Sequence, residues 1–423
     1  MVEIIPRIIH RGEVNVPGSK SYTHRLLIAS ALSNGICTLK NCLRSEDTLL
    51  TLEALRKMGV RIDDLITEIK VHGTSGILKT CKEPVFLGNS GTSMRLLTGV
   101  AALGRGEYTL SGTSRMSARP IEDLLDGLRG LGANARSLNN NGCPPVLIEG
   151  GTIRGGRIRL KCGLSSQFLS SLLLIAPYTD EGVEIKVIEG PVSKPYIDMT
   201  IEIMAKSGVE VKRDGYLSFR VEGRGCYSAG DHYVEPDCSQ AGYFWAAAAV
   251  TGAEIKVRGI VKESHQGDLR ITGLLERMGC EIVFEKDGIS VKGGSLSGID
   301  ADMSDMPDMV PTLAVAASFA KGVTVIKNVG HLKEKESDRL SAVVNELSKT
   351  GIEAKCTGKD LVIKGGIPRG AEIDTYNDHR IAMSFAIAGL KVPGIFIKDE
   401  KCVEKSFPDF WKVLETLGRG TFV

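Results

Sequence analysis

The sequence predicts an α/β fold made of six copies of one unit, in the order β, buried helix, β, surface helix, β, β. Two periodic features predict it. Six amphipathic stretches recur about every 70 residues, each ending in a glycine: Gly59, Gly132, Gly208, Gly279, Gly351 and Gly418. Six almost wholly apolar stretches recur in step with them, with predicted starts at Thr23, Thr92, Ser166, Ser239, Asp308 and Asp378.

The amphipathic stretches are predicted to be surface helices. One of them places its apolar residues at the i, i+3, i+4, i+7 spacing of a single helix face: Ile121, Leu124, Leu125 and Leu128. The glycine after each stretch is expected to end the helix in a left-handed conformation. Three helices are expected to begin with proline, where the missing N–H costs little: Pro120, Pro195 and Pro408.

The apolar stretches are predicted to be helices buried on most sides, because they have no polar face. They cover residues 25–32, 94–103, 168–176, 241–250, 309–320 and 381–390. Most surface helices are followed by an apolar run, a turn and a second run, as in a β-hairpin. Two examples are 280–284 with 289–292, and 353–356 with 361–364.

The composition is that of a globular protein, with 423 residues, 42% apolar and 25% charged. A net charge of +2 is too balanced for a general polyanion-binding surface, and the low aromatic content argues against a nucleic-acid partner. Ten cysteines without a Cys-x-x-Cys pair predict reduced thiols and no structural zinc. The N-terminus does not resemble a signal peptide or a membrane span, so we expect a cytoplasmic location.

Polar residues precede each apolar helix, in the segments 19–25, 89–95, 165–167, 237–240, 305–308 and 377–380. They suit N-capping, and capping alone stays an open alternative for Asp237 and Ser239. Capping does not explain the cations in these segments, because a helix N-terminus is itself electropositive. These cations are Lys20, Arg25, Arg95 and Arg380.

Further cations stand near the starts of the surface helices: Arg115, Arg119, Lys335, Arg339 and Lys405. If the repeat brings these helix ends together, the cations line a cleft suited to a small molecule with several negative charges. The segment around Lys20 is not a nucleotide-binding P-loop, because Ser19 separates Gly18 from Lys20.

Eight segments, in order along the chain, resemble motifs of the enolpyruvyl transferases, most closely of members that use shikimate 3-phosphate. They are 17–21, 88–92, 115–120, 165–167, 193–196, 335–339, 377–380 and 405–409. The resemblance implies two lobes of three repeats each, an inside-out α/β barrel whose buried helices point their N-termini at a cleft between the lobes. Residues 19–234 would mainly bind shikimate 3-phosphate, and residues 1–18 with 235–423 would complete the phosphoenolpyruvate site.

The resemblance also implies the reaction. The enolpyruvyl group of phosphoenolpyruvate would pass to the 5-hydroxyl of shikimate 3-phosphate, by addition and elimination through a tetrahedral intermediate, with release of phosphate. This is a step of the shikimate pathway to chorismate and aromatic amino acids. No metal, organic cofactor, nucleic acid or membrane is implied, and we expect a monomer.

Site residues are carried over from the matching motifs. The shikimate 3-phosphate set is Lys20, Ser21, Arg25, Ser165, Ser166, Gln167, Ser193, Tyr196, Asp308 and Lys335. The phosphoenolpyruvate set is Lys20, Asn89, Gly91, Arg115, Gln167, Arg339, Arg380 and Lys405. Asp308 would be the base at the 5-hydroxyl, Glu336 would handle the methylene proton, and Lys20 would be the acid at the bridging oxygen. A simple N-cap for Asp308 and a solvated charge run for Glu336 stay open as alternatives.

Some positions depart from the commonest pattern of the family. Leu96 stands where many members have Pro, and His331 and Lys333 stand where Asn and Arg are frequent. Gly91 resembles the glyphosate-sensitive type. One rival is the family branch that uses a UDP-amino sugar, but the Cys or Asp of its mobile loop is missing between Gly104 and Arg119. The other rival is a non-catalytic repeat scaffold that binds an anionic partner.

Overall fold

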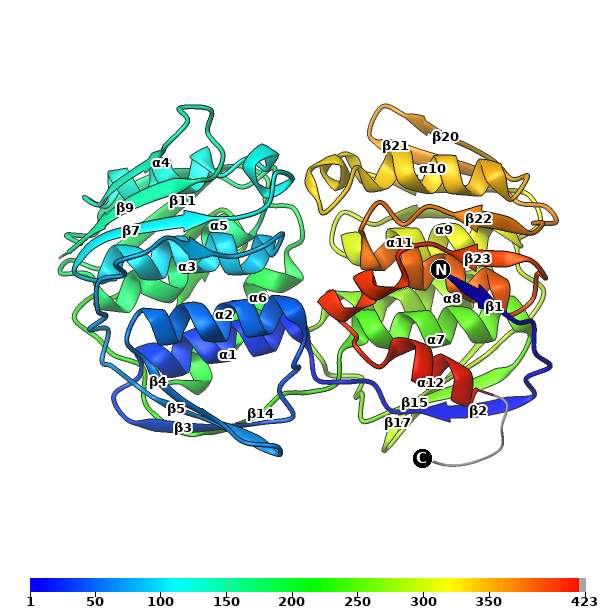
Figure 1. Cartoon of the computed structure of the whole chain (residues 1–423), viewed down its shortest axis with the longest axis horizontal. Coiled ribbons are helices and arrows are strands. Elements are labelled where there is room, and N and C mark those ends of the chain that lie inside the picture. Colours follow the sequence, from blue (N-terminus) through cyan, green and yellow to red (C-terminus); the bar gives the residue numbers. More distant parts are fainter. Residues whose placement is uncertain (152, 418–423) are drawn as a thin grey trace. The chain divides into compact units, whose positions relative to one another are not determined.

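The computed structural model describes residues 1–151 and 153–417, and the chain forms two compact units (Figure 1). The central unit is Gly18–Val234. The terminal unit joins Met1–Pro17 to the chain from Glu235 onward. The sequence placed the first boundary one residue later, between residues 18 and 19, and the second between the same residues, 234 and 235.

Three four-stranded sheets form the described part of the central unit. In each sheet, the first two strands in spatial order are parallel. The second strand pairs antiparallel with the nearer strand of a β-hairpin. The first sheet is β14 (Asp231–Tyr233), β3 (Ile36–Lys40), β5 (Glu68–His72) and β4 (Arg61–Asp64). The second is β6 (Val85–Phe86), β7 (Gly106–Ser111), β9 (Val146–Gly150) and β8 (Asn134–Ser137). The third is β10 (Gly156–Lys161), β11 (Val183–Glu189), β13 (Ser218–Val221) and β12 (Lys212–Asp214).

The terminal unit repeats this plan in two of its sheets. The first is β2 (Arg11–Val14), β15 (Glu254–Arg258), β17 (Gly288–Lys292) and β16 (Glu281–Glu285). The second is β18 (Asp300–Asp302), β19 (Val323–Lys327), β21 (Asp360–Lys364) and β20 (Glu353–Thr357). The third sheet has three strands in the described residues, β22 (Ala371–Ile373), β23 (Ile395–Ile397) and β1 (Val2–Ile4).

Three strands leave the regular order of the predicted repeat. Strand β2 precedes the first buried helix in the chain but pairs with β15 of the terminal unit. Conversely, β14 precedes the fourth buried helix but pairs with β3 of the central unit. Strand β1 takes the antiparallel place beside β23 that a hairpin strand holds in the other sheets. The two units have therefore exchanged their first strands.

The six buried helices are confirmed, and they pack against one another inside each unit. They are α1 (Lys20–Leu32), α3 (Gly91–Leu103), α5 (Gln167–Ile175), α7 (Cys238–Thr251), α9 (Val310–Ser318) and α11 (His379–Gly389). Three predicted starts are wrong by two to four residues. Ser19, Ser90 and Asp237 are the N-caps of α1, α3 and α7, in place of Thr23, Thr92 and Ser239. The reason is that the polar residues at the predicted starts already lie in the helices.

The surface helices are α2 (Glu46–Lys57), α4 (Glu122–Gly130), α6 (Pro195–Lys206), α8 (Ile271–Met278), α10 (Arg339–Lys349) and α12 (Phe410–Thr416). Five of the predicted end glycines have φ between 82° and 114°, as expected for a left-handed end. The sixth, Gly418, lies outside the described residues. Only Pro195 occupies a first helical position; Pro120 and Pro408 precede the N-cap residues of α4 and α12.

Each unit has its own hydrophobic core, built around the buried helices. All ten cysteines are free, and six of them are buried, which agrees with the predicted reduced thiols. No helix in the described part of the chain combines the length and the apolar character needed to cross a bilayer.

A second set of glycines lets each hairpin pass close over the end of a buried helix. A Cβ added to any of them would lie 1.9–2.4 Å from a main-chain carbonyl oxygen at that helix end. They follow or end the second hairpin strand in five repeats: Gly73, Gly150, Gly223, Gly293 and Gly365. The repeat therefore depends on a backbone contact that only glycine permits.

We predict that Gly365→Ala lowers the free energy of unfolding by about 1–3 kcal/mol, the usual cost of overpacking. Its Cβ would lie 1.9 Å from the carbonyl oxygen of Ala320, and main chain cannot move aside cheaply. The matched control is Gly273→Ala inside α8, where nothing lies within 4 Å of the added Cβ and alanine favours the helix. Urea unfolding of both variants measures the difference; equal stabilities would contradict the contact.

Candidate functional site

Most of the predicted site residues gather in two clusters, one in each unit. The terminal cluster consists of Asp308, Glu336, Arg339, Asp378 and Arg380, with Tyr243 and Lys335 beside them. The central cluster consists of Lys20, Ser21, Arg25, Asp47, Asn89, Gly91, Arg95, Arg119, Ser165, Ser166, Gln167, Ser193 and Tyr196.

Arg339 is the centre of the terminal cluster. It is the first residue of α10, and its side chain is 1% exposed. Nη1 donates to Asp308 at 2.7 Å and Nη2 donates to Glu336 at 2.8 Å. Nε donates to Asp378 at 2.8 Å. All three arms of this guanidinium are therefore held by carboxylates.

Asp308 joins Arg339 to a second buried arginine, Arg380 at the start of α11. Its Oδ1 accepts from Arg339, and its Oδ2 accepts from Nη2 of Arg380 at 2.9 Å. Nη1 of Arg380 donates to the hydroxyl of Tyr243 at 2.9 Å. One carboxylate thus fixes the spacing of two guanidinium groups.

Both alternative interpretations of the acidic residues are wrong. Asp308 lies inside the 3₁₀ turn η4 (Pro307–Met309); the N-cap residues are Met306 for η4 and Met309 for α9, so Asp308 occupies neither cap position. Its charge is used by Arg339 and Arg380. Glu336 is not a solvated residue of a charge run, because its side chain is 10% exposed and pairs with Arg339. Of the predicted caps, Asp237 and Asp378 do cap α7 and α11.

Charge in the terminal cluster is close to balanced. Burial lowers the pKa of Arg339, but the Coulomb attraction of Asp378, Glu336 and Asp308 outweighs it and raises the pKa above its ordinary value. The pKa of Arg380 is raised in the same way, first by Asp308 and then by Tyr243, against the effect of burial. Both guanidinium groups are therefore held charged, and the expected excess of positive charge is partly compensated by the protein.

Lys335, Lys405 and His331 complete this region. Lys335 is half-buried and directly precedes Glu336, and Lys405 is buried at the end of η6 (Glu400–Lys405). His331 is buried in η5 (Gly330–Glu334). Burial, followed by repulsion from Lys335, lowers the pKa of His331 to about 3. Its imidazole is neutral at pH 7, so this position carries a polar group without charge.

Lys20 in the central cluster has a carboxylate partner that the sequence interpretation missed. Its Nζ lies 3.1 Å from Oδ2 of Asp47, and both side chains are buried. Asp47 lies in the first turn of α2. A carboxylate in a helix first turn is common for reasons of the helix dipole alone, so the sequence carried no specific signal of this pair.

Arg25 is anchored by main chain and hydroxyls. Nε donates to Thr200 at 2.8 Å, Nη1 to the Ser21 carbonyl at 2.9 Å, and Nη2 to the Tyr196 carbonyl at 3.1 Å. The ring of Tyr196 lies under the guanidinium, 5.9 Å from its centre. Burial lowers the pKa of Arg25 to about 10, so it stays protonated at pH 7. It holds Ser21 and Tyr196, two predicted site residues, at one place.

Gly91 is needed by its neighbour Arg119. A Cβ at position 91 would lie 2.5 Å from Nη2 and 2.8 Å from Cζ of Arg119. Nη1 of Arg119 donates to the carbonyl of Asn89 at 3.1 Å and to its side-chain oxygen at 3.3 Å. Gly91, Asn89 and Arg119 thus pack together at the start of α3.

Gln167 joins the starts of α5 and α3. Nη1 of Arg95 donates to its Oε1 at 2.8 Å, and its Nε2 donates to Thr92 at 2.9 Å. Ser165 caps the same turn by accepting from the Gln167 N–H at 3.2 Å. Ser166, the N-cap residue of α5, is buried but accepts no capping bond.

Ser193 and Arg115 lie on the segments that lead into helical turns. Ser193 is buried with φ of 56°, and its Oγ has no hydrogen-bond partner among the described residues. A hydroxyl buried in that state is suited to a ligand. Arg115 is half-buried just before η1 (Met116–Ala118).

Comparison with known proteins places the chain in one family. The family model described as EPSP synthase (3-phosphoshikimate 1-carboxyvinyltransferase) matches residues 7–414. Curated relatives named 3-phosphoshikimate 1-carboxyvinyltransferase are similar over nearly the whole chain. One from Shewanella baltica is 43% identical over 418 residues, covering 97% of this chain and 98% of its own. One from Syntrophobacter fumaroxidans is 42% identical, covering 96% and 97%.

The chain belongs to the EPSP synthase family. An EPSP synthase structure from Acinetobacter baumannii superposes with a TM-score of 0.82 at 31% identity, covering 98% of each chain. The enolpyruvyl transferase NikO from Streptomyces tendae shares the fold, with a TM-score of 0.78 at 19% identity over 98% of this chain and 97% of its own. The fold class that the sequence predicted is confirmed by these structures.

The structure shows the surroundings of the three positions that depart from the family pattern. Leu96 is fully buried inside α3, where an apolar side chain suits the surroundings. Lys333 is exposed and His331 is buried and neutral. The η5 turn therefore adds one solvent-facing cation and one uncharged polar group.

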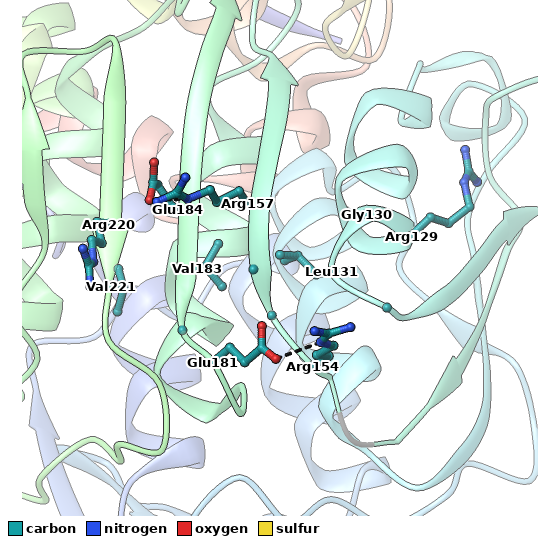
Figure 2. A pocket seen from close by; sticks show the side chains of 14 residues that line it. Arg129, Gly130, Leu131, Arg154, Arg157, Glu181, Val183, Glu184, Arg220 and Val221 are labelled. Atoms are coloured by element: carbon teal, nitrogen blue, oxygen red, sulfur yellow. Dashed lines mark hydrogen bonds and ion pairs between the residues drawn. The ribbon is translucent and has the colours of Figure 1, made fainter.

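A hollow elsewhere in the central unit contains none of the predicted site residues. Its volume is about 660 Å³, and it is lined by the last turn of α4 and by the starts of β10 and β11. Figure 2 shows Glu181 turned toward Arg154, which it meets at 2.8 Å. Arg157 pairs with Glu184 at 3.0 Å, and the side chains of both arginines are mostly exposed. Since its cations are already paired and solvated, the hollow does not compete with the two clusters as an anion site.

We predict that Asp378→Asn lowers the free energy of unfolding by about 1.5–3 kcal/mol, the value of hydrogen bonds to charged groups. The asparagine side chain can still cap α11. Its NH₂ group would, however, face Nε of Arg339 and the hydroxyl of Ser337, whose hydrogen bonds Oδ2 of Asp378 accepts at 2.8 and 3.0 Å.

The control for this variant is Asp338→Asn. Asp338 caps α10 by accepting from the Ser341 N–H at 3.1 Å, and no ion pair joins it to an arginine of the described residues. Asparagine caps as well as aspartate, so the change should stay within about 0.5 kcal/mol. Urea unfolding followed by circular dichroism compares the two; an equal loss in both would show that the buried charge pair contributes nothing.

Proposed function

We propose that the protein transfers the enolpyruvyl group of phosphoenolpyruvate to the 5-hydroxyl of shikimate 3-phosphate and releases inorganic phosphate. The observation that supports it most is the pair of buried arginines spaced by Asp308, with Glu336 on the same guanidinium as Asp308. Two forked cations at fixed spacing suit a substrate that carries both a carboxylate and a phosphate. The curated relatives are named for this transfer.

Shikimate 3-phosphate would bind mainly to the central unit. Its phosphate and carboxylate need several donors, and the hydroxyl-rich set around Arg25 supplies them: Lys20, Ser21, Ser165, Ser166, Gln167, Ser193 and Tyr196, with Lys335 and Asp308 from the terminal unit. Ser193 supports this assignment, because its buried Oγ forms no hydrogen bond to another described residue.

Phosphoenolpyruvate would bind to Arg339, Arg380 and Lys405 of the terminal unit, and to Lys20, Asn89, Gly91, Arg115 and Gln167 of the central unit. Nε of Arg380 is buried and has no hydrogen-bond partner in the described chain. A buried donor in that state favours an incoming oxygen anion.

The proton steps need groups near the 5-hydroxyl and near the methylene carbon. Asp308 would take the proton of the 5-hydroxyl as its oxygen attacks C2 of phosphoenolpyruvate. Glu336 would deliver a proton to C3, which makes a methyl group, and would take one back as phosphate leaves. Lys20 would donate toward the bridging oxygen. Positioned acid–base groups of this kind contribute about 10²–10⁴-fold each.

The proposal also covers the oligomeric state and the cellular location of the protein. We propose a monomer in the cytoplasm that acts on small-molecule substrates. Size-exclusion chromatography with light scattering tests the monomer, and fractionation of cells tests the location.

The deciding experiment measures phosphate release by the purified protein from phosphoenolpyruvate. We expect release that depends on shikimate 3-phosphate, with the carboxyvinyl ether as the second product. UDP-N-acetylglucosamine in its place should give none. Release only with the UDP-sugar would identify the rival branch, and release with neither acceptor would favour a binding scaffold.

We predict that Asp308→Asn and Glu336→Gln each lower kcat by about 10²–10⁴-fold. Each substitution removes a proton-accepting oxygen at a position fixed by Arg339. Asp305→Asn is the matched control, because Asp305 lies three residues from Asp308 and meets the exposed Arg270 at 3.4 Å. Steady-state kinetics with circular dichroism checks the result. Near-normal turnover in a folded Asp308→Asn or Glu336→Gln protein would overturn the assigned role.

We predict that glyphosate inhibits competitively with phosphoenolpyruvate. Position 91 has no Cβ, so Arg119 keeps its place against Asn89 and the start of α3 stays open to an anion. Initial rates at several inhibitor concentrations should show a rising apparent KM for phosphoenolpyruvate and a constant kcat. Rates unchanged at millimolar glyphosate would contradict this prediction.

A further inference from the structure

Asp268 is a buried carboxyl group that none of the proposed steps uses. It lies in the 3₁₀ turn η3 (Gly267–Arg270) and is 4% exposed. The hydroxyl of Ser239, the second residue of α7, donates to its Oδ2. A buried carboxylate costs free energy unless it is compensated, so its neighbours decide what it does.

One face of α7 links Asp268 to the Arg380–Asp308 pair. Ser239, Gly242 and Tyr243 stand at i, i+3 and i+4 of α7, so they share one face of the helix. Ser239 holds Asp268 and Tyr243 holds Arg380.

Gly242 brings the Asp308 turn onto the same face. A Cβ at position 242 would lie 2.3 Å from Sδ of Met309, so the missing side chain lets Met309 pack directly on α7. Asp308 is the residue before Met309 in the same turn. Ser239, which holds Asp268, therefore lies one helical turn from Tyr243, which holds Arg380, and close to Gly242, on which the neighbour of Asp308 packs.

Charged groups face Asp268 from each of these elements: Asp237 from the start of α7, Asp308 from η4 and Arg380 from α11. Burial, reinforced by the negative charge of Asp308, raises the pKa of Asp268 to about 7, although Ser239 and Arg380 act in the opposite direction. The charge of Asp268 thus changes across neutral pH, beside an arginine that the proposed function assigns to an anion.

We propose that Asp268 is a positioning residue of the anion site, whose charge sets how strongly Arg380 attracts the substrate anion. When Asp268 is protonated, Arg380 is shared by fewer negative groups and binds the anion more tightly. When Asp268 is ionised, its negative charge opposes the anion. Because binding linkage is reciprocal, a bound anion favours the protonated form. This inference rests on the proposed function for the identity of the anion, phosphoenolpyruvate.

The first test compares the KM for phosphoenolpyruvate in wild type and Asp268→Asn from pH 6 to pH 8.5. The asparagine mimics the protonated carboxyl. The ratio of wild-type to variant KM should be near one at pH 6 and rise to about three- to tenfold at pH 8.5, up to one pKa unit of coupling. Ionisation of the substrate itself cancels in this ratio. The kcat should stay within about threefold, since Asp268 takes no part in the proton steps.

Two further variants sharpen the comparison. Ser239→Ala keeps the carboxyl but removes the donor that favours its charged form, so the rise in KM should move to higher pH. Asp305→Asn, two residues before the η4 turn and paired with the exposed Arg270, should keep the wild-type profile. A KM ratio independent of pH in a wild-type enzyme that turns over would overturn the inference, and so would an unmoved profile in Ser239→Ala.

A readout without substrate separates this inference from the proposed function. A carboxyl whose folded-state pKa is raised to about 7 binds more protons in the folded than in the unfolded state, whose carboxyl pKa is about 4. Its contribution to stability is therefore fully present below about pH 4 and is lost as the pH rises to about 7. The Tm of Asp268→Asn minus that of wild type should increase across this window. A constant difference would overturn the inference even if the transferase assay succeeds; absence of wild-type turnover would instead overturn the proposed function.

Discussion

The carboxylate bridge of Asp308 between Arg339 and Arg380 is the interaction on which the terminal unit's site depends. Buried charges of this kind cost several kcal/mol each unless they are paired. The bridge brings together three segments from two successive repeats, namely η4, the start of α10 and the start of α11. Their approach is possible because the buried helices pack side by side with their first residues at one end. Removing the Asp308 carboxylate would take away the ion-pair partner of Arg380, while Arg339 would keep Glu336 and Asp378.

The carboxylates also decide which ligands the cluster accepts. Asp308, Glu336 and Asp378 already satisfy much of the donor capacity of Arg339, and Asp47 pairs with Lys20 in the other unit. A weak monoanion gains little by competing with these carboxylates. An anion with two charged groups at the right spacing would contact both arginines at once, and Nε of Arg380 has no hydrogen-bond partner among the described residues. The protein's own carboxylates therefore compensate the cations of this cluster, and under the proposed function the geometry of the ligand would determine selectivity.

Much of the fold was predictable because it rests on local periodicity. The 3.6-residue pattern of α4 and the end glycines identify the surface helices, and the absence of a polar face identifies the buried ones. The strand patterns did not predict the exchange of β2 and β14, because a strand's pattern says nothing about its partner; only the family resemblance implied it, by assigning residues 1–18 to the terminal lobe and residues 19–234 to the central lobe. In the site, the motif residues were identified by resemblance. Asp47, Tyr243 and Asp268 were missed, because a first-turn acid, an apolar-stretch tyrosine and a buried acid in a turn each look like ordinary structural residues.

The glycines separate two kinds of constraint in this repeat. Gly365 and its equivalents are fixed by the fold, since a main-chain carbonyl occupies the space of a side chain. Gly91 and Gly242 are fixed by the site, since what fills the space is the guanidinium of Arg119 or the sulfur of Met309. The first kind recurs in five repeats and the second kind does not recur. A repeat that is uniform in its packing glycines can thus carry a different polar group at each helix start. In the terminal unit Arg339 has three carboxylate partners, of which Asp308 is shared with Arg380. In the central unit Lys20 is paired with Asp47.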